Sequence, residues 1–252
     1  FQSVPEDKIR DKPEHDAVKM LFIDGGNNDV ISSPHMRLSF IRIYACIYQG
    51  NVRVKDSLHE FFAMISVEKS EKSRCITAKF YPHIGDYTPK SFSVCPESGD
   101  GLSSISETLG TAAEKIRKIA ELEVAESLIP YLGKDGMIIR DGDLAIEDDI
   151  EKPQYESLFS AAKTSGVILC GLSKTTGMLT DTGHALVSAL RNIAPDGVWA
   201  YSRLFENRNP MHPADVLIVR LHSRSRYMFR LDINRSIPYG IDEIIIPLAR
   251  NS

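Results

Sequence analysis

The chain has 252 residues, of which 42% are hydrophobic and 25% are charged, and its formal net charge at pH 7 is -4. This composition is ordinary for one or two globular domains, and the negative total does not suggest a protein that coats nucleic acid by charge, although a locally basic groove is compatible with it. No apolar run approaches the ~20 residues of a membrane helix, and the first residues, FQSVPEDKIRDKPEHD, lack the pattern of a secretory signal. We therefore expect a cytoplasmic protein without a membrane partner.

The cysteines are scattered along the chain without a CxxC pair, at Cys46, Cys75, Cys95 and Cys170. Zinc knuckles and disulfide frameworks both rely on characteristic cysteine spacings. We therefore expect neither, and we interpret most of these cysteines as buried thiols.

The N-terminal residues 1–16 are polar and charged and contain two prolines, which predicts an arm. A single domain is expected over residues 17–252. Its first strand is predicted at Val18–Ile23, followed by Asp24 and a turn of Gly and Asn residues, GGNN. The next strand, Arg37–Gln49, is dense in β-branched and aromatic residues.

Further strand patterns occupy the first third of the chain, which predicts consecutive antiparallel strands at Asn51–Val54, Phe61–Val67 and Cys75–Tyr81. From Ser103 to Tyr131 the apolar residues recur at three- and four-residue steps, which predicts a long helix that Pro130 closes.

Strands and helices then alternate, a pattern typical of α/β proteins. The predicted elements are strand Met137–Arg140, helix Tyr155–Lys163, strand Val167–Gly171 and helix Thr182–Asn192. The tail returns to strand patterns and ends in an apolar segment: Val198–Phe205, Ala214–Leu221, Tyr227–Leu231 and Ile241–Leu248.

Two predicted strands are followed by an acid and a glycine, at Asp24-Gly25 and Asp141-Gly142. A hard divalent cation is commonly held by one or two carboxylates together with substrate phosphates. Glycine beside each acid allows a phosphate backbone to approach closely. The pair therefore predicts a metal site, with the alternative that Asp-Gly merely marks a turn at a strand end.

A third acid lies on the apolar side of the long helix. At 100° per residue, Glu123 falls in the arc of Ile116, Ile119 and Ala120, whereas Glu121 is expected on the solvated side. A buried carboxylate needs a cation or a hydrogen-bonding partner, and a metal shared with the two aspartates would satisfy Glu123. The alternative is that Glu123 lies at the edge of the core and reaches water.

The chain resembles the NurA nuclease family over nearly its whole length, in the segments IDGGN, RLSFIRIYACIY, AELEVAESL, IIRDGDLAI, ILCGLSKTT and VRLHSRSRYMFRLDI. The resemblance implies an α/β fold with an RNase H-like (Piwi-like) mixed sheet flanked by helices. It implies an enzyme that depends on Mn²⁺, with Mg²⁺ as the alternative cation. The implied activities are those of a 5′-to-3′ DNA exonuclease and a single-strand endonuclease. It also implies a homodimer that works with the hexameric ATPase HerA in DNA end resection.

The same resemblance implies roles for individual residues. Asp24 and Asp141 match metal ligands, and the helical ligand matches Glu123, or Glu121 with a shifted alignment; the helix-face argument favours Glu123. Lys174 matches a phosphate-binding lysine, with the alternative of a lysine that points into solvent from a plain turn.

The resemblance also covers the C-terminal strands. Asp232 matches either a further ligand or a residue that fixes Arg230. The family continues into a histidine beyond the last residue of this sequence, so we expect the C-terminal part of the domain to be incomplete.

Cations and an aromatic residue alternate in the segment HSRSRY, as expected of a surface that touches a phosphate backbone. DNA contacts are predicted for Lys174 and for five arginines: Arg37, Arg42, Arg224, Arg226 and Arg230. A solvated hairpin tip accounts equally well for the arginines of this segment.

The main hypothesis is a DNA nuclease whose acids hold two metal ions roughly 3.5–4 Å apart for in-line attack at phosphorus. The alternative from another class is a non-catalytic RNase H-like adaptor that docks on a HerA-type ATPase. Use of the same nuclease in phage defence is a further alternative.

Overall fold

The computed structural model describes the chain apart from residues 11–16, 70–73, 96–101, 203–210 and 251–252. The described strands form one sheet in the order β1-β9-β10-β11-β8-β7-β2-β3-β4-β5-β6. Their bounds are β1 Gln2–Val4, β2 Lys19–Ser33, β3 Met36–Gln49, β4 Val52–Lys69, β5 Arg74–Ile84, β6 Ser93–Val94, β7 Met137–Asp141, β8 Ile168–Ser173, β9 Val198–Tyr201, β10 Ala214–Arg220 and β11 Phe229–Asn234.

The central strands combine an antiparallel meander with two parallel strands. β2, β3 and β4 pair antiparallel in chain order, whereas β7 pairs parallel to β2 and β8 pairs parallel to β7. A helix precedes each of the two parallel strands. The resulting order β8-β7-β2-β3-β4 is that of an RNase H-like fold, which confirms the predicted fold class.

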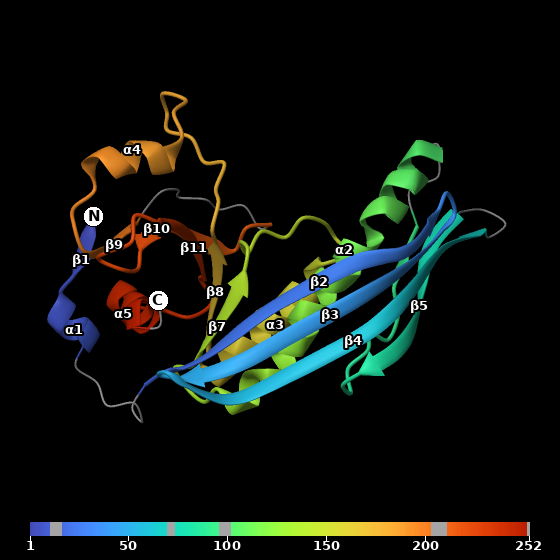
Figure 1. Ribbon diagram of the computed structural model, residues 1–252, viewed down its shortest axis with the longest axis horizontal. Coiled ribbons are helices and arrows are strands. Elements are labelled where there is room, and N and C mark those ends of the chain that lie inside the picture. The colour runs from blue at the N-terminus through green and yellow to red at the C-terminus, as the bar shows by residue number, and fades with distance from the viewer. Residues whose placement is uncertain (11–16, 70–73, 96–101, 203–210, 251–252) are drawn as a thin grey trace.

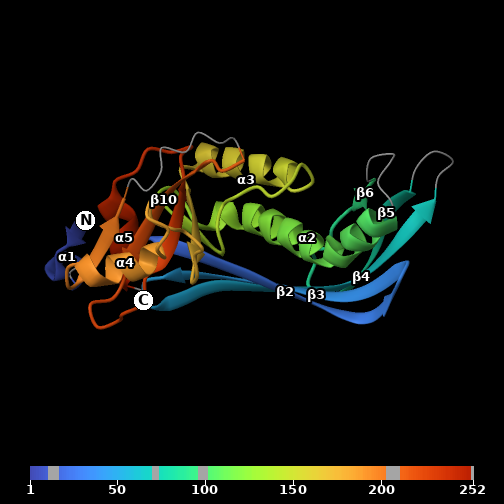
Figure 2. The ribbon, with the colours of Figure 1, turned by 90° about the horizontal axis from the view of Figure 1, so that it is seen from above.

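Helices cover different faces of this sheet (Figures 1 and 2). α2 (Leu102–Leu128) and α3 (Lys152–Ser165) lie over the central strands and enclose the larger core, to which Leu21 and Ile23 of β2 contribute. α5 (Ile241–Arg250) belongs to a second core with the C-terminal strands and with Met20 of β2. The other helices are α1 Glu6–Arg10, the 3-10 helix η2 Ile129–Tyr131 and α4 Leu186–Ile193.

β2 is longer than predicted. It continues through the Gly and Asn residues to Ser33, because β3 offers a hydrogen-bonding partner over that whole length. The parallel partner β7 accompanies β2 only as far as Ile23. Asp24 therefore lies inside a strand, at the point where one of its two neighbours ends, and the predicted turn after Asp24 is wrong.

The N-terminal residues are more ordered than the arm that was predicted. β1 pairs antiparallel with β9, and α1 packs against α5. Arg250 of α5 donates hydrogen bonds to the carbonyl oxygens of Lys8 and Ile9, at 2.5 and 2.6 Å. The last part of the predicted arm, residues 11–16, lies outside the described residues.

A disulfide joins Cys75, in β5, to Cys95, directly after β6. The prediction that the cysteines form no disulfide is therefore wrong. Pairing of β5 with β6 brings the two residues together, and no short cysteine motif announces it. Cys46 and Cys170 are free thiols, the second of them buried. No helix in the described part of the chain is long and apolar enough to span a membrane.

Candidate active site

Asp24 and Asp141 lie at the same level of two neighbouring parallel strands. The ladder between β2 and β7 ends with the pair Ile23 and Arg140, and the two aspartates are the next residues. Paired strands lie about 4.8 Å apart, so the two carboxylates are neighbours. Asp24 is exposed, and the side chain of Asp141 is 45% exposed. The strand pairing therefore places the two predicted acids at adjacent positions on the same face of the sheet.

The helical acids do not join them as predicted. Alternation along β2 directs Ile23 and Gly25 toward α2 and Asp24 toward the opposite face, where Phe22 packs against the second core. Among the described residues, no group of three or more His, Cys, Asp or Glu side chains is arranged to hold a metal ion. The structure therefore supports two adjacent carboxylates rather than a closed cluster of three.

Glu123 is held by another residue. Its Oε2 accepts a hydrogen bond of 2.6 Å from the Tyr87 hydroxyl, and the side chain is half-buried. Burial and the bond to Glu123 raise the pKa of Tyr87, so this tyrosine stays protonated and remains a donor. Tyr87 satisfies the carboxylate that sequence reasoning assigned to a metal.

Glu121 lies within electrostatic range of Asp24, and the expectation that it faces solvent is wrong. The residue is only 2% exposed, and its carboxylate forms ion pairs with Arg117 and Arg140, the latter at 3.3 Å. Burial raises the pKa of Glu121, the two arginines oppose this, and the charge of Asp24 adds to the increase. Glu121 is thus within electrostatic range of Asp24 but already has cationic partners.

Gly25 makes this arrangement possible. A Cβ atom at this position would lie 2.7 Å from Glu121 Oε1 and 2.8 Å from Ile43 Cδ1. The glycine beside Asp24 therefore serves the approach of α2, whereas the sequence suggested the approach of a phosphate. The backbone carbonyl of Gly25 accepts a hydrogen bond of 3.3 Å from Arg117.

We expect Gly25→Ala to destabilise the protein by about 1–3 kcal/mol, because the added methyl group overpacks the contact between β2 and α2. Urea unfolding followed by circular dichroism measures the change. Gly26→Ala is the matched control, since a Cβ there has no atom within 4 Å, and its stability should be unchanged or slightly higher. Equal unfolding midpoints for both variants would contradict the close contact.

Arg140 is a central residue of the site that sequence reasoning did not single out. It is buried at the end of β7 and donates hydrogen bonds of 2.6 Å to the Tyr155 hydroxyl and 3.0 Å to the Asp143 carbonyl oxygen, besides its contact with Glu121. The sequence pattern that could have identified it is the arginine that directly follows the apolar residues of a buried strand, in MIIRD. Arg140 therefore contacts α2, α3 and the chain segment after Asp141, and so holds these three parts together.

Asp232 fixes Arg230 and is not available as a metal ligand. It is 0% exposed, and it accepts hydrogen bonds from Arg230 at 2.7 and 2.8 Å and from the Leu144 backbone N–H at 3.1 Å. His212 Nε2 lies 3.0 Å from the same carboxylate. Arg230 also pairs with Asp143 at 3.1 Å, so the network holds the loop after β7 in place.

Burial opposes the charge of Asp232, but the hydrogen bonds from His212 and Arg230 hold its pKa below the ordinary value. A depressed pKa contributes stability that is present above the unfolded-state value and is lost as the pH falls through the folded-state value. We expect the stability advantage of wild type over Asp232→Asn to shrink below about pH 4. Urea titrations from pH 3 to 7 measure it, and a constant difference would contradict the assignment.

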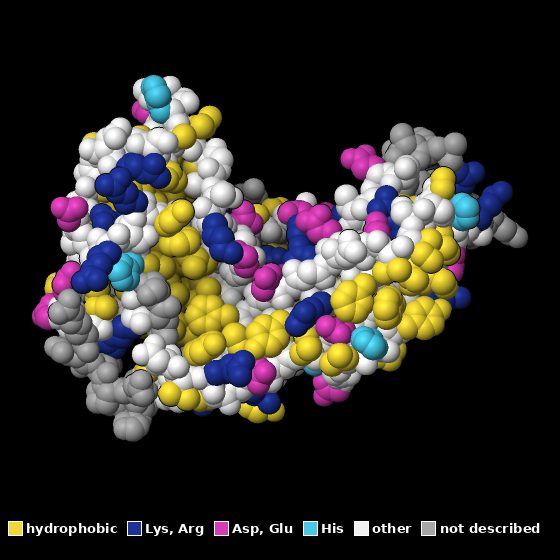
Figure 3. All heavy atoms as spheres, viewed as in Figure 1, with side chains coloured by type: hydrophobic (Ala, Val, Ile, Leu, Met, Phe, Trp, Pro, Cys, Tyr) yellow, Lys and Arg dark blue, Asp and Glu magenta, His cyan; other side chains and the backbone are white. Residues whose placement is uncertain are grey.

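Lys174 lies beside Asp141, with its Nζ 3.4 Å from Asp141 Oδ2 and 76% of its side chain exposed. Both residues line a cavity of about 550 Å³ at the carboxyl ends of β7 and β8. Arg117, Arg140 and Glu151 also line it. Figure 3 shows acidic and basic side chains together in the hollow between the two ends of the molecule. The site therefore places the Asp141 carboxylate and the exposed ammonium group of Lys174 next to a polar cavity.

The predicted DNA-contacting arginines differ in their availability. Arg230 is committed to the internal partners given above, and Arg37 pairs with Asp29 at 2.5 Å. Arg42 is about half exposed and pairs with Glu60 at 3.5 Å. Arg224 and Arg226 are exposed in the turn before β11. The prediction of a DNA contact is thus weakest for Arg230.

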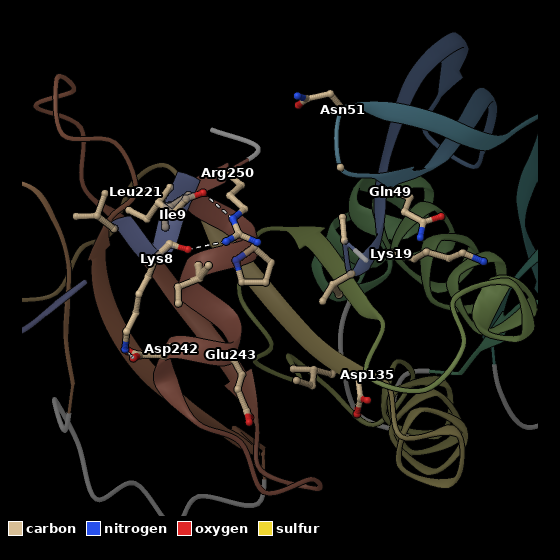
Figure 4. A pocket seen from close by; sticks show the side chains of 18 of the residues that line it. Lys8, Ile9, Lys19, Gln49, Asn51, Asp135, Leu221, Asp242, Glu243 and Arg250 are labelled. Carbon is tan, nitrogen blue, oxygen red and sulfur yellow. Dashed lines mark hydrogen bonds and ion pairs between the residues drawn. The ribbon is translucent and has the colours of Figure 1, made fainter. Parts of the chain in front are cut away.

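A larger cavity, of about 1380 Å³, lies at α1, α5 and the starts of β2 and β7 (Figure 4). Neither Asp24 nor Asp141 lines it. An exposed ion pair of Lys8 with Asp242, at 3.2 Å, stands at its wall. The cavity is therefore separate from the candidate active site.

Comparisons with known proteins identify no family, and the solved structures named below have TM-scores under 0.5. No family model and no curated protein match the chain. Among solved structures, the catalytic domain of human endonuclease V has 10% identity and a TM-score of 0.47, over 99% of this chain and 80% of that one. Endonuclease V of Ciona intestinalis, in complex with an inosine-containing DNA, has 10% identity and a TM-score of 0.39 over 88% and 73%. Argonaute of Aquifex aeolicus has 11% identity and a TM-score of 0.31 over 92% and 24%.

Proposed function

We propose that this protein is a metal-dependent nuclease that hydrolyses DNA phosphodiesters. The observation that carries the proposal is the position of Asp24 and Asp141, side by side on parallel strands and open to solvent. Two such carboxylates fit Mn²⁺ or Mg²⁺, because these ions keep several waters and take further oxygen ligands from substrate phosphates. A bound divalent cation supplies an activated water and stabilises charge at phosphorus.

The chain's own residues then have distinct tasks. Asp24 and Asp141 hold the cation, and Lys174 stands where it can bind a phosphate oxygen beside Asp141. The Arg140 hydrogen bonds and the Arg230 network keep the chain after Asp141 in position. Glu121, which is held by two arginines, helps to order the site from the helix and is not assigned to the metal.

The finer proposal follows the resemblance to NurA nucleases: 5′-to-3′ exonuclease and single-strand endonuclease activity, a homodimer, and cooperation with a HerA-type ATPase in end resection. The second candidate is a non-catalytic adaptor for such an ATPase. It is favoured by the engagement of Glu121 and Glu123 with other side chains, which leaves two carboxylates for a metal.

The direct test is cleavage of 5′-labelled single- and double-stranded DNA with Mn²⁺, with Mg²⁺ or with a chelator. We expect products with a divalent cation and none with the chelator, and restored cleavage when the cation is added back. The activity must follow the protein peak through size-exclusion chromatography, which excludes a contaminant. A folded protein that cleaves neither substrate, alone or with the ATPase, would overturn the nuclease and favour the adaptor.

A further inference from the structure

We propose that the open face of β3, β4 and β5 binds single-stranded DNA by stacking unpaired bases on its aromatic side chains, and leads the DNA strand to Asp24. The inference rests on the proposed function, because it names the form of substrate that reaches that site. α2 covers the opposite face of these strands, and among the described elements no helix lies over this one (Figures 1 and 2). Figure 3 views this face directly and shows hydrophobic side chains gathered over it, with charged residues and a histidine among them. The face is therefore available to a ligand.

The aromatic residues of this face come from three neighbouring strands. Phe61 of β4 belongs to the core under α2, so alternation along the strand directs Phe62 to the open face. Phe62 pairs with Phe40 of β3 on one side and with Tyr81 of β5 on the other. The ring centroids of Phe40 and Phe62 are 5.3 Å apart, and Tyr81 is 48% exposed. In RNA-recognition sheets, aromatic residues on an open face stack two or three unpaired bases, so this row offers the same kind of platform.

Cations stand beside these rings, as the binding of a phosphate backbone requires. Arg42 is the next residue of β3 on this face after Phe40, and 56% of its side chain is exposed. Lys79 of β5 is exposed and pairs with Met64, next to the aromatic row. Glu60, an acid on the same face, is only 13% exposed and lies 3.5 Å from Arg42. Aromatic rings interleaved with cations are typical of sites for single-stranded nucleic acid, whereas the buried core of a permanent protein interface is depleted of charged residues.

The aromatic row continues into the candidate active site. Asp24 pairs with Tyr44 of β3, which lies four residues along the strand from Phe40 and on the same face. Four residues of a β-strand span about 13 Å, so a DNA strand stacked on the row reaches Asp24 within a few nucleotides. Asp56, another acid of this face, lies in the row beyond Asp24 and therefore outside this path. The bases of a duplex are hidden in its stack, so the face favours unpaired DNA.

The test is fluorescence anisotropy of labelled oligothymidylate of about 16 nucleotides with the full chain, in the presence of a chelator that prevents cleavage. We expect Phe62→Leu combined with Tyr81→Leu to weaken binding by about 10- to 100-fold, because leucine remains apolar but cannot stack on a base. Tyr131→Leu is the matched control. Tyr131 is 51% exposed, but its ring lies against Lys55 on the helix side of the sheet, so its loss should leave the affinity unchanged. Thermal melts of all variants establish that they fold.

Unchanged affinity of the double variant, or equal weakening by Tyr131→Leu, would overturn the stacking surface. Tighter binding of a duplex than of the single strand by wild type would also overturn it. Light scattering gives a second readout: a double variant that binds DNA as wild type does, but changes from dimer to monomer, would assign the face to a second copy instead. Because binding is measured without metal, a protein that binds single strands through this face but never cleaves them would overturn the nuclease and leave the stacking surface standing.

Discussion

Asp24→Asn and Asp141→Asn are each expected to reduce the rate of DNA cleavage by about 10³-fold, while the unfolding midpoint changes little. The amide keeps the size of the carboxylate but removes the charge that holds a divalent cation, and metal activation is worth several kcal/mol of barrier. Neither side chain is buried, so neither change removes packing. Single-turnover cleavage of labelled DNA over a range of Mn²⁺ concentrations measures the effect.

Asp56→Asn provides the control for this pair. Asp56 is an exposed carboxylate on β4, so it changes the net charge equally without touching the site. Its cleavage rate should match wild type. If both site variants kept full activity, the two aspartates would not be the metal ligands, and cleavage would have to be assigned to other residues.

Arg140→Met is expected to destabilise the protein by about 3–5 kcal/mol. Removing one member of a buried ion pair leaves its partner charge uncompensated. Glu121, at 2% exposure, would retain only Arg117, and the Tyr155 hydroxyl and the Asp143 carbonyl would each lose a donor. Urea unfolding at pH 7 measures the loss.

A double variant separates charge from packing. Glu121→Gln combined with Arg140→Met removes both charges, so the combination should be less destabilised than the sum of the two single changes. Strict additivity would show that Arg140 stabilises the fold through Tyr155 and the loop after Asp141 instead of through Glu121.

The sequence was sufficient to predict the strands of the core and the proximity of the two aspartates, Asp24 and Asp141. Patterns of β-branched and apolar residues locate β3, β7 and β8, and the parallel arrangement then brings Asp24 and Asp141 together. Nothing local distinguishes the GGNN segment from a turn. It remains a strand because β3 supplies partners along its whole length, which is a tertiary effect.

The helical acid was assigned to the wrong environment for a related reason. The helix-face argument assumes that the apolar residues of α2 alone define its buried side, and on that assumption Glu121 faces solvent. Its environment is decided by Arg140 and Gly25, which come from two different strands. The hydroxyl that satisfies Glu123 comes from Tyr87, 36 residues away. Contacts of this kind are not encoded in spacing along the helix.

The position of Asp24 inside a continuous strand has a mechanical consequence. Its backbone belongs to the ladder with Tyr44 of β3, so this side of the site is a fixed reference. Asp141 is the last residue of β7 and is followed by Gly142, whose φ of 108° is accessible mainly to glycine. Asp141 is nevertheless paired with Leu172 of β8, and the Gly142 N–H donates a hydrogen bond to the Leu172 carbonyl oxygen. Backbone pairing therefore holds both acids, so a cation and a phosphate would be accommodated by rotation of the two carboxylate side chains and not by movement of the strands.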